Sequence, residues 1–168
     1  MAEKQISRMA DLEFLTELVY VLKNGIKTGN PAALDKLYVE NDTTFPDRKT
    51  VEEQLTFGLG AIIDLQEIHN TRITSRGNAY ALFAAFVAVQ FPASLLRQDL
   101  EEADSQKPFA ARANIVTNLT SLADALEDND EESPLHDFVS AARQGTNTEK
   151  NRRARFRWFH RALTSDHL

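Results

Sequence analysis

Six of the twelve residues from Lys150 to Arg161 are lysine or arginine, in a chain that is otherwise acidic. Guanidinium groups suit phosphate and carboxylate partners because their planar forks donate parallel hydrogen bonds. Lys150, Arg153, Arg157 and Arg161 share one arc if the segment is a helix. We expect these four cations to bind DNA phosphates or an acidic partner. Arg152 would face the apolar side, so we expect it to form an internal salt bridge. The alternative is a solvated basic face that the protein's own acids neutralise.

The same segment places Arg155 five residues before His160, and Arg153 seven residues before it. These Arg-x4-His and Arg-x6-His strings resemble the ribonuclease motif of the small helical HEPN family, which implies an RNA-cleaving enzyme. On a continuous helix Arg155 and His160 would point about 140° apart, and Arg153 and His160 would stand about 10 Å apart along the axis. Such an enzyme would need a dimer interface or a distorted helix end to bring the groups together. It is the enzymatic alternative.

The histidines, glycines and cysteine content of the chain indicate no further catalytic or metal-binding motif. The four histidines, at positions 69, 136, 160 and 167, are scattered without the spacing of a helical metal site. Gly58-Leu59-Gly60 lies inside an apolar pattern rather than after a strand, so it is not a phosphate-binding loop. The chain has no cysteine, which removes thiol catalysis and thiolate metal sites. We therefore predict no catalytic residue, metal or cofactor in this chain.

A cap signal and an apolar stripe must position the cations. Thr146 and Thr148 are both candidate N-caps, and Thr146 with Glu149 has the spacing of a capping box. The stripe that would anchor this helix in a core consists of Phe156, Phe159 and Leu163.

The rest of the chain also reads as helical. Asn30-Pro31 predicts an N-cap with proline at the first helical position, and Thr50 with Glu53 predicts a capping box. Gly58 and Gly60 inside that helix suggest close approach of another helix. The segment 78–90 is apolar all round, which is typical of a helix in the middle of a bundle. We predict an all-α fold, a bundle of six or seven helices with this apolar helix at its centre.

Composition indicates a protein without a membrane segment. The 168 residues carry a formal charge of −6 and are 42% apolar, which fits a single helical domain, 1–168. Two subdomains, 1–92 and 106–168, would be joined by an acidic linker whose carboxylates we expect to be solvated. The longest apolar run, 79–91, is too short to span a bilayer, and the start has no apolar signal core. We expect a cytoplasmic protein with no membrane partner.

Several short segments resemble a large prokaryotic family. They are Arg8–Phe14, Leu34–Tyr38, Asn70–Ile73 leading into Tyr80–Phe83, and 138–153, where Gly-Thr-Asn precedes the basic helix. In this order they resemble the helical C-terminal half of the GmrSD-type restriction and phage-defence proteins.

The resemblance implies a helical module in a DNA restriction or defence setting. Full-length members of the family carry a ParB-like half, implicated in nucleotide hydrolysis or DNA cleavage, and many carry an HNH nuclease domain. Neither is present here, so we expect an excised domain or a split polypeptide that contacts a ParB-like nuclease or NTPase partner. Asn70 and Arg72 match the family's Asn-Thr-Arg pattern, although capping and structural pairing explain them equally well. A helical regulatory or antitoxin-like protein is a further alternative.

Overall fold

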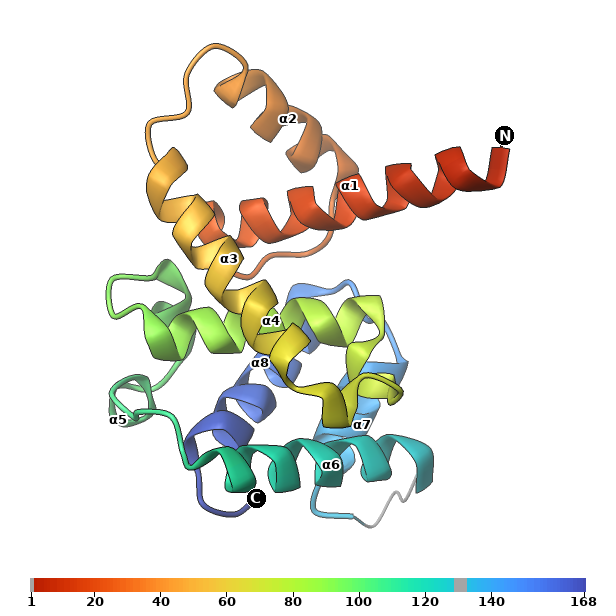
Figure 1. The fold of residues 1–168 in the computed structure, drawn as a ribbon, viewed down its shortest axis with the longest axis vertical. Coiled ribbons are helices and arrows are strands. Elements are labelled where there is room, and N and C mark those ends of the chain that lie inside the picture. The colour runs from red at the N-terminus through yellow and green to blue at the C-terminus, as the bar shows by residue number, and fades with distance from the viewer. Residues whose placement is uncertain (1, 129–132) are drawn as a thin grey trace.

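Helices are the only regular secondary structure in the described part of the chain. The computed structural model of the protein describes residues 2–128 and 133–168, which form eight α-helices and no strand (Figure 1). Three short 3-10 helices, η1 (Gln66–Ile68), η2 (Arg72–Thr74) and η3 (Leu95–Asp99), lie between them. The α-helices are α1 (Ala2–Asn24), α2 (Pro31–Asn41), α3 (Arg48–Asp64), α4 (Arg76–Gln90), α5 (Glu102–Ser105), α6 (Arg112–Asp128), α7 (His136–Arg143) and α8 (Glu149–Thr164).

The prediction of an all-α bundle is confirmed, and the additional helix is α5. This helix is a single turn of four residues inside the segment that we expected to be an acidic linker. Within the described ranges, no helix has both the length and the apolar character needed to cross a membrane.

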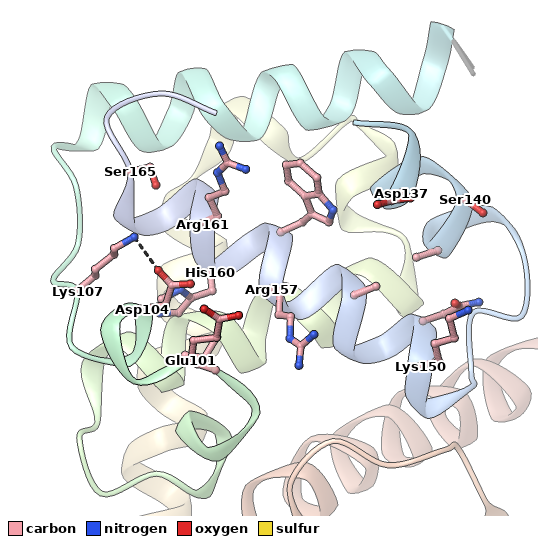
Figure 2. Close-up of a pocket in the computed structure, with 15 residues that line it drawn as sticks. Glu101, Asp104, Lys107, Asp137, Ser140, Lys150, Arg157, His160, Arg161 and Ser165 are labelled. Atoms are coloured by element: carbon pink, nitrogen blue, oxygen red, sulfur yellow. Dashed lines mark ion pairs between the residues drawn. The ribbon is translucent and has the colours of Figure 1, made fainter. Parts of the chain in front are cut away.

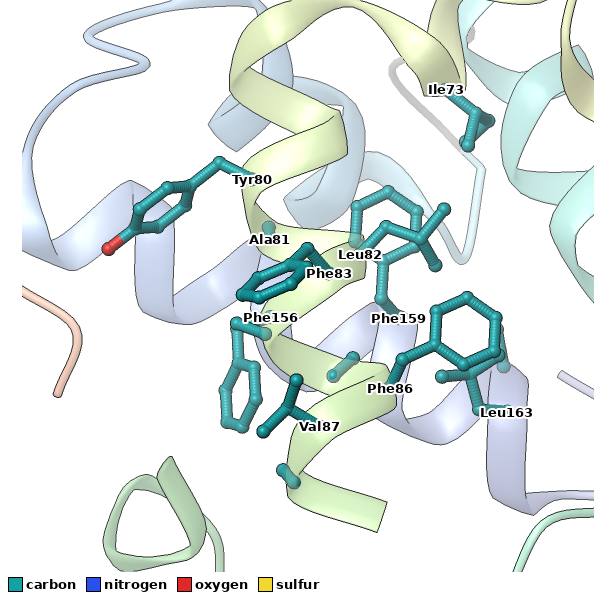
Figure 3. Packing of buried hydrophobic residues seen from close by; sticks show 14 of the residues in the cluster. Ile73, Tyr80, Ala81, Leu82, Phe83, Phe86, Val87, Phe156, Phe159 and Leu163 are labelled. Carbon is teal, nitrogen blue, oxygen red and sulfur yellow. The ribbon is translucent and has the colours of Figure 1, made fainter. Parts of the chain in front are cut away.

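Helix α4 is the centre of the bundle, as its sequence predicted. Ten of its fifteen residues are buried, and it packs against α1, α3 and α8 (Figure 1). A helix can be buried on every side only when neighbours cover each face, so the all-round apolar pattern of 78–90 requires this position. The contact with α8 joins the two parts of the chain that we considered as subdomains. Their buried side chains lie in one cluster, which Figure 3 shows around Leu82, Phe83 and Phe86 of α4 and Phe156 and Phe159 of α8.

Local signals define some helix ends and not others. Asn30 caps α2 as predicted, since its side chain accepts from the Ala32 N–H at 3.0 Å and Pro31 is the first helical residue. The capping box predicted from Thr50 and Glu53 is wrong. Helix α3 begins at Arg48, so its N-cap is Asp47, three residues before Thr50, and Asp47 forms no side-chain cap hydrogen bond among the described residues.

The two glycines of α3 differ in their surroundings. A Cβ on Gly58 would lie 2.6 Å from the ring of Phe83, so this glycine allows α4 to approach closely, as predicted. A Cβ on Gly60 would meet nothing within 4 Å, so the same prediction is wrong there. Only Gly58 offsets its low helix propensity by close packing.

Candidate functional site

Helix α8 is a rigid support for the predicted cations. Of the two candidate caps, Thr148 is the N-cap, because its hydroxyl accepts from the Asn151 N–H at 3.3 Å. On the inner side Phe156, Phe159 and Leu163 are fully buried. The Phe159 ring meets the Phe138 ring of α7 edge to face, with centroids 5.4 Å apart. The predicted apolar stripe therefore anchors the helix and leaves its opposite face outward.

Three of the four predicted cations line one groove along this outer face. Lys150, Arg157 and Arg161 are exposed, and Figure 2 shows them in sequence along α8. The groove has a volume of about 820 Å³, and its other wall comes from α7 and from the segment containing α5. Among the described residues, no carboxylate oxygen lies within 4.0 Å of a side-chain nitrogen of these three cations.

Two of the three cations are nevertheless oriented by other groups. The Nε of Arg157 donates to the backbone carbonyl of Asp99 at 3.2 Å, which leaves its terminal nitrogens toward the groove. The guanidinium of Arg161 lies over the Trp158 ring, 5.4 Å from its centroid. Such a cation–π contact holds the charge in place without neutralising it. These contacts restrict the two arginines while leaving their charge available.

The groove also contains acids, so its charge is mixed. Glu101, Asp104 and Asp137 line it together with the three cations and Lys107. Four bases and three acids leave a formal excess of +1 when His160 is neutral. Lys107 and Asp104 form an ion pair at 2.7 Å (Figure 2), and this hydrogen bond is the main cause that lowers the pKa of Asp104. The groove is weakly electropositive, and its positive charge is concentrated on α8.

Arg153, the fourth predicted cation, is not part of this groove. Its guanidinium forms ion pairs with Asp99 and, at 2.7 Å, with Glu149 of the same helix. Asp99 is only 8% exposed. This corrects the expectation that the acids of this segment are all solvated. Because Arg153 already has two carboxylate partners, it stabilises the contact of η3 with α8.

Two further arginines of α8 are internal. Arg152 is buried, and its guanidinium lies 3.5 Å from a carboxylate oxygen of Glu17, so the predicted internal salt bridge is confirmed. Arg155, which sequence reasoning considered only as a nuclease residue, is 1% exposed. It donates to the carbonyl of Thr146 and to Oδ1 of Asn78 at 3.3 Å. Burial and the neighbouring charge of Arg152 lower the pKa of Arg155 to about 10, which still leaves it charged at neutral pH.

His160 lines the groove but is almost completely buried. The ring is 2% exposed, and its Nε2 has no hydrogen-bond partner among the described residues. Burial is the main cause that lowers the pKa of His160 to about 4, against the opposing effect of Asp104. Arg155 bonds to Thr146 and Asn78, whereas His160 lies beside Phe156 and Asp104. The Arg-x4-His pair therefore does not converge on one point in this chain.

Of the two residues predicted from the Asn-Thr-Arg segment, Asn70 and Arg72, only Arg72 has a side-chain partner among the described residues. Thr71, in the Asn-Thr-Arg segment, caps η2 by accepting from the Ile73 N–H at 3.3 Å. Arg72 pairs with Glu127 of α6 at 3.0 Å. In residues 2–128 and 133–168, no group of three or more potential metal ligands is placed to hold an ion.

Comparisons with protein-family models, with curated proteins and with solved structures gave no significant match to this chain.

Proposed function

We propose that this chain is a non-catalytic helical module that contacts DNA phosphates through Lys150, Arg157 and Arg161. In this proposal it acts beside a nuclease or nucleotide-hydrolysing partner. One observation carries the DNA contact. The three cations are exposed on a core-anchored helix, and no carboxylate of the described residues pairs with them. The other three arginines of α8 have partners inside the protein. The partner domain is proposed from the sequence resemblance to the GmrSD-type family.

The spacing of the cations suits an extended polyanion. Lys150 and Arg157 are seven residues apart and Arg157 and Arg161 four, which corresponds to about 10 Å and 6 Å along a helix axis. Charges at these separations can contact successive phosphates of a backbone but not one small ion together. The acids of the groove weaken the attraction, so we expect binding of low affinity without sequence preference. Contacts to phosphates position a protein on DNA and carry no direct sequence information.

The test is the salt dependence of binding to a short DNA duplex, followed by fluorescence anisotropy. Three phosphate contacts predict a slope of about −2.7 in a plot of log K against log salt. Affinity should then fall about 40-fold between 50 and 200 mM salt. Changing Lys150, Arg157 and Arg161 together to alanine should remove most of this slope. All three side chains are exposed, so circular dichroism should report an unchanged fold.

The matched control changes three exposed cations on other helices, Lys36, Arg48 and Lys49, to alanine. This variant loses the same charge but keeps the outer face of α8, so we expect it to retain the slope of the unmodified protein. Equal losses in both triple variants would mean that binding follows net charge rather than this face. An unmodified protein that binds no duplex even at 50 mM salt would refute the DNA contact.

A further inference from the structure

A second polar pocket lies on the opposite side of α8 from the groove, between α1 and the start of α4. It has a volume of about 290 Å³. Its lining includes Glu13 and Glu17 of α1, Arg76 and Tyr80 of α4, and Arg152 of α8. Three helices that are distant in sequence therefore contribute charged or hydrogen-bonding groups to one small space.

The hydroxyl of Tyr80 has no hydrogen bond of good geometry among the described residues. The residue is 2% exposed, and the group nearest in effect is Arg152, which is close enough to lower the pKa of the phenol against the larger effect of burial. Figure 3 shows this hydroxyl pointing away from the phenylalanines of the core. Burial raises the pKa of Tyr80 to about 12, so the phenol keeps its proton and can donate. A buried hydroxyl without a partner costs free energy, which a bound acceptor would recover.

The guanidinium of Arg152 is loosely held above this phenol. It lies over the Tyr80 ring, 4.2 Å from the centroid. Its polar contacts are all long: 3.5 Å to Glu17, 3.4 Å to the Lys27 carbonyl and 3.4 Å to Oδ1 of Asn147. Ion-paired N–H donors normally approach their acceptors to about 2.7–2.9 Å. Arg152 therefore keeps hydrogen-bonding capacity for a closer acceptor.

The pocket and its floor carry an excess of positive charge. Arg76 lies 3.4 Å from Glu13 and 3.6 Å from Glu17, while Glu17 is also shared with Arg152. Arg155 is outside the lining but lies against it, since a Cβ on the lining residue Gly77 would be 2.7 Å from its Nη1; among the described residues it has no carboxylate within 4.0 Å. The lining itself is balanced, with two guanidinium groups and two carboxylates, and the adjacent Arg155 brings the local formal charge to +1. Buried cations are favourable only when they are paired, so one more anionic group would complete this cluster.

We propose that this pocket binds one small oxyanion, a carboxylate or a phosphate. Arg76 and Arg152 would supply the positive charge, and Tyr80 would donate a hydrogen bond. The anion would displace Glu13 from Arg76, because the Arg76–Glu13 ion pair is more exposed than the Arg76–Glu17 pair and therefore contributes less. Arg76 and Gly77 begin α4, and the free N–H groups of a helix start favour an anion at the same place. The small volume excludes a nucleic-acid strand, so this site is independent of the proposed DNA contact.

The test is a titration of the whole chain with inorganic phosphate and, separately, with acetate. Sodium chloride keeps the ionic strength constant. We expect a saturable rise in the melting temperature, with amide shifts in nuclear magnetic resonance spectra at Gly77 and Tyr80. The anion that saturates at the lower concentration identifies whether phosphate or carboxylate is preferred. The absence of saturation with both anions, or shifts confined to other residues, would overturn the proposal.

Two substitutions should change the affinity in opposite directions. Tyr80→Phe removes only the unpartnered hydroxyl, so it should keep the fold and weaken binding about 3- to 10-fold. Tyr20→Phe is its control and should have no effect. Glu13→Gln removes the competing carboxylate and should strengthen binding about 2- to 5-fold. Its control is Glu53→Gln, an exposed site on α3. Unchanged affinity in Tyr80→Phe or in Glu13→Gln would contradict the proposed geometry.

The alanine variant of Lys150, Arg157 and Arg161 separates this site from the groove. It should titrate with phosphate like the unmodified protein. Loss of the titration in that variant would assign the phosphate to the groove and would refute the pocket, whatever the DNA measurements give.

Discussion

Replacing His160 with leucine should make the stability of the protein less sensitive to acid. The ring is buried, and its Nε2 has no partner in the described part of the chain. The charges that act on it are Asp104, which favours the protonated ring, and Lys107 and Arg97, which oppose it. Leucine fills a similar volume without a polar atom. At pH 7 we therefore expect the variant to be as stable as the unmodified protein, or slightly more stable.

The size of the effect comes from the two states of the imidazole. In the folded protein burial lowers the pKa of His160 to about 4, while the unfolded chain has the ordinary value of 6.5. The folded state therefore disfavours the protonated ring. The contribution of the neutral ring to the free energy of unfolding is fully present above pH 6.5. It decreases as the pH falls from 6.5 to 4. One pKa unit corresponds to 1.36 kcal/mol, so the full loss is on the order of 3 kcal/mol, with about 2 kcal/mol lost between pH 7 and pH 5.

Urea unfolding at pH 7, 6 and 5 would measure this difference. Carboxylates also titrate in this range, so the quantity of interest is the difference between the two proteins at each pH. We expect the variant to gain about 2 kcal/mol over the unmodified protein between pH 7 and pH 5. The equivalent change at the exposed His136 tests whether loss of any imidazole has this effect. Parallel stability curves for the unmodified protein and the His160 variant would refute the account of a buried, neutral ring.

Two further predictions concern single helices and carry their own controls. Gly58→Ala places a Cβ 2.6 Å from the Phe83 ring, so it should lower the free energy of unfolding by about 1–3 kcal/mol, measured in urea. Gly60→Ala meets nothing within 4 Å and should raise that free energy by up to about 1 kcal/mol; losses of equal size would contradict the packing at Gly58. Thr148→Ala removes the cap of α8 and should lower the melting temperature, at a cost of about 1 kcal/mol. Thr146→Ala removes no cap hydrogen bond and should cost less, and the reverse order would mean that Thr146 is the cap.

Features of the fold that depend on a few neighbouring residues could be predicted from the sequence. The all-round apolar pattern of 78–90 identified the central helix, and Asn30-Pro31 identified the start of α2. The start of α3 was missed because its N-cap forms no side-chain hydrogen bond. Thr50 and Glu53 have the right types and spacing for a capping box, but they lie within the first turns of a helix that has already begun. A local pattern cannot distinguish these two positions without the tertiary contacts.

The candidate site was predictable as a helix face but not as a set of available charges. Helical spacing correctly placed Arg152 inside, and it placed Lys150, Arg157 and Arg161 outside. Whether a cation is available depends on which carboxylates reach it, and these come from elsewhere in the chain. Asp99 reaches Arg153 because η3 packs against α1 and α4, which buries an aspartate that the sequence assigned to a solvated acidic linker.

The Tyr80 pocket depends even more on contacts between distant segments, which the sequence does not predict. The sequence placed Tyr80 in the apolar helix 78–90, but it gave no sign that Arg155 is buried. Their significance lies in what is missing around them: a hydrogen-bond partner for the phenol and, among the described residues, a carboxylate for the guanidinium. A missing partner of this kind becomes visible only when α1, α4 and α8 are packed together. The sequence of no single helix reveals it. A buried hydroxyl without a hydrogen bond is costly, and at Tyr80 it lies beside two guanidinium groups that line the same pocket, which is why we propose an oxyanion there and not at His160.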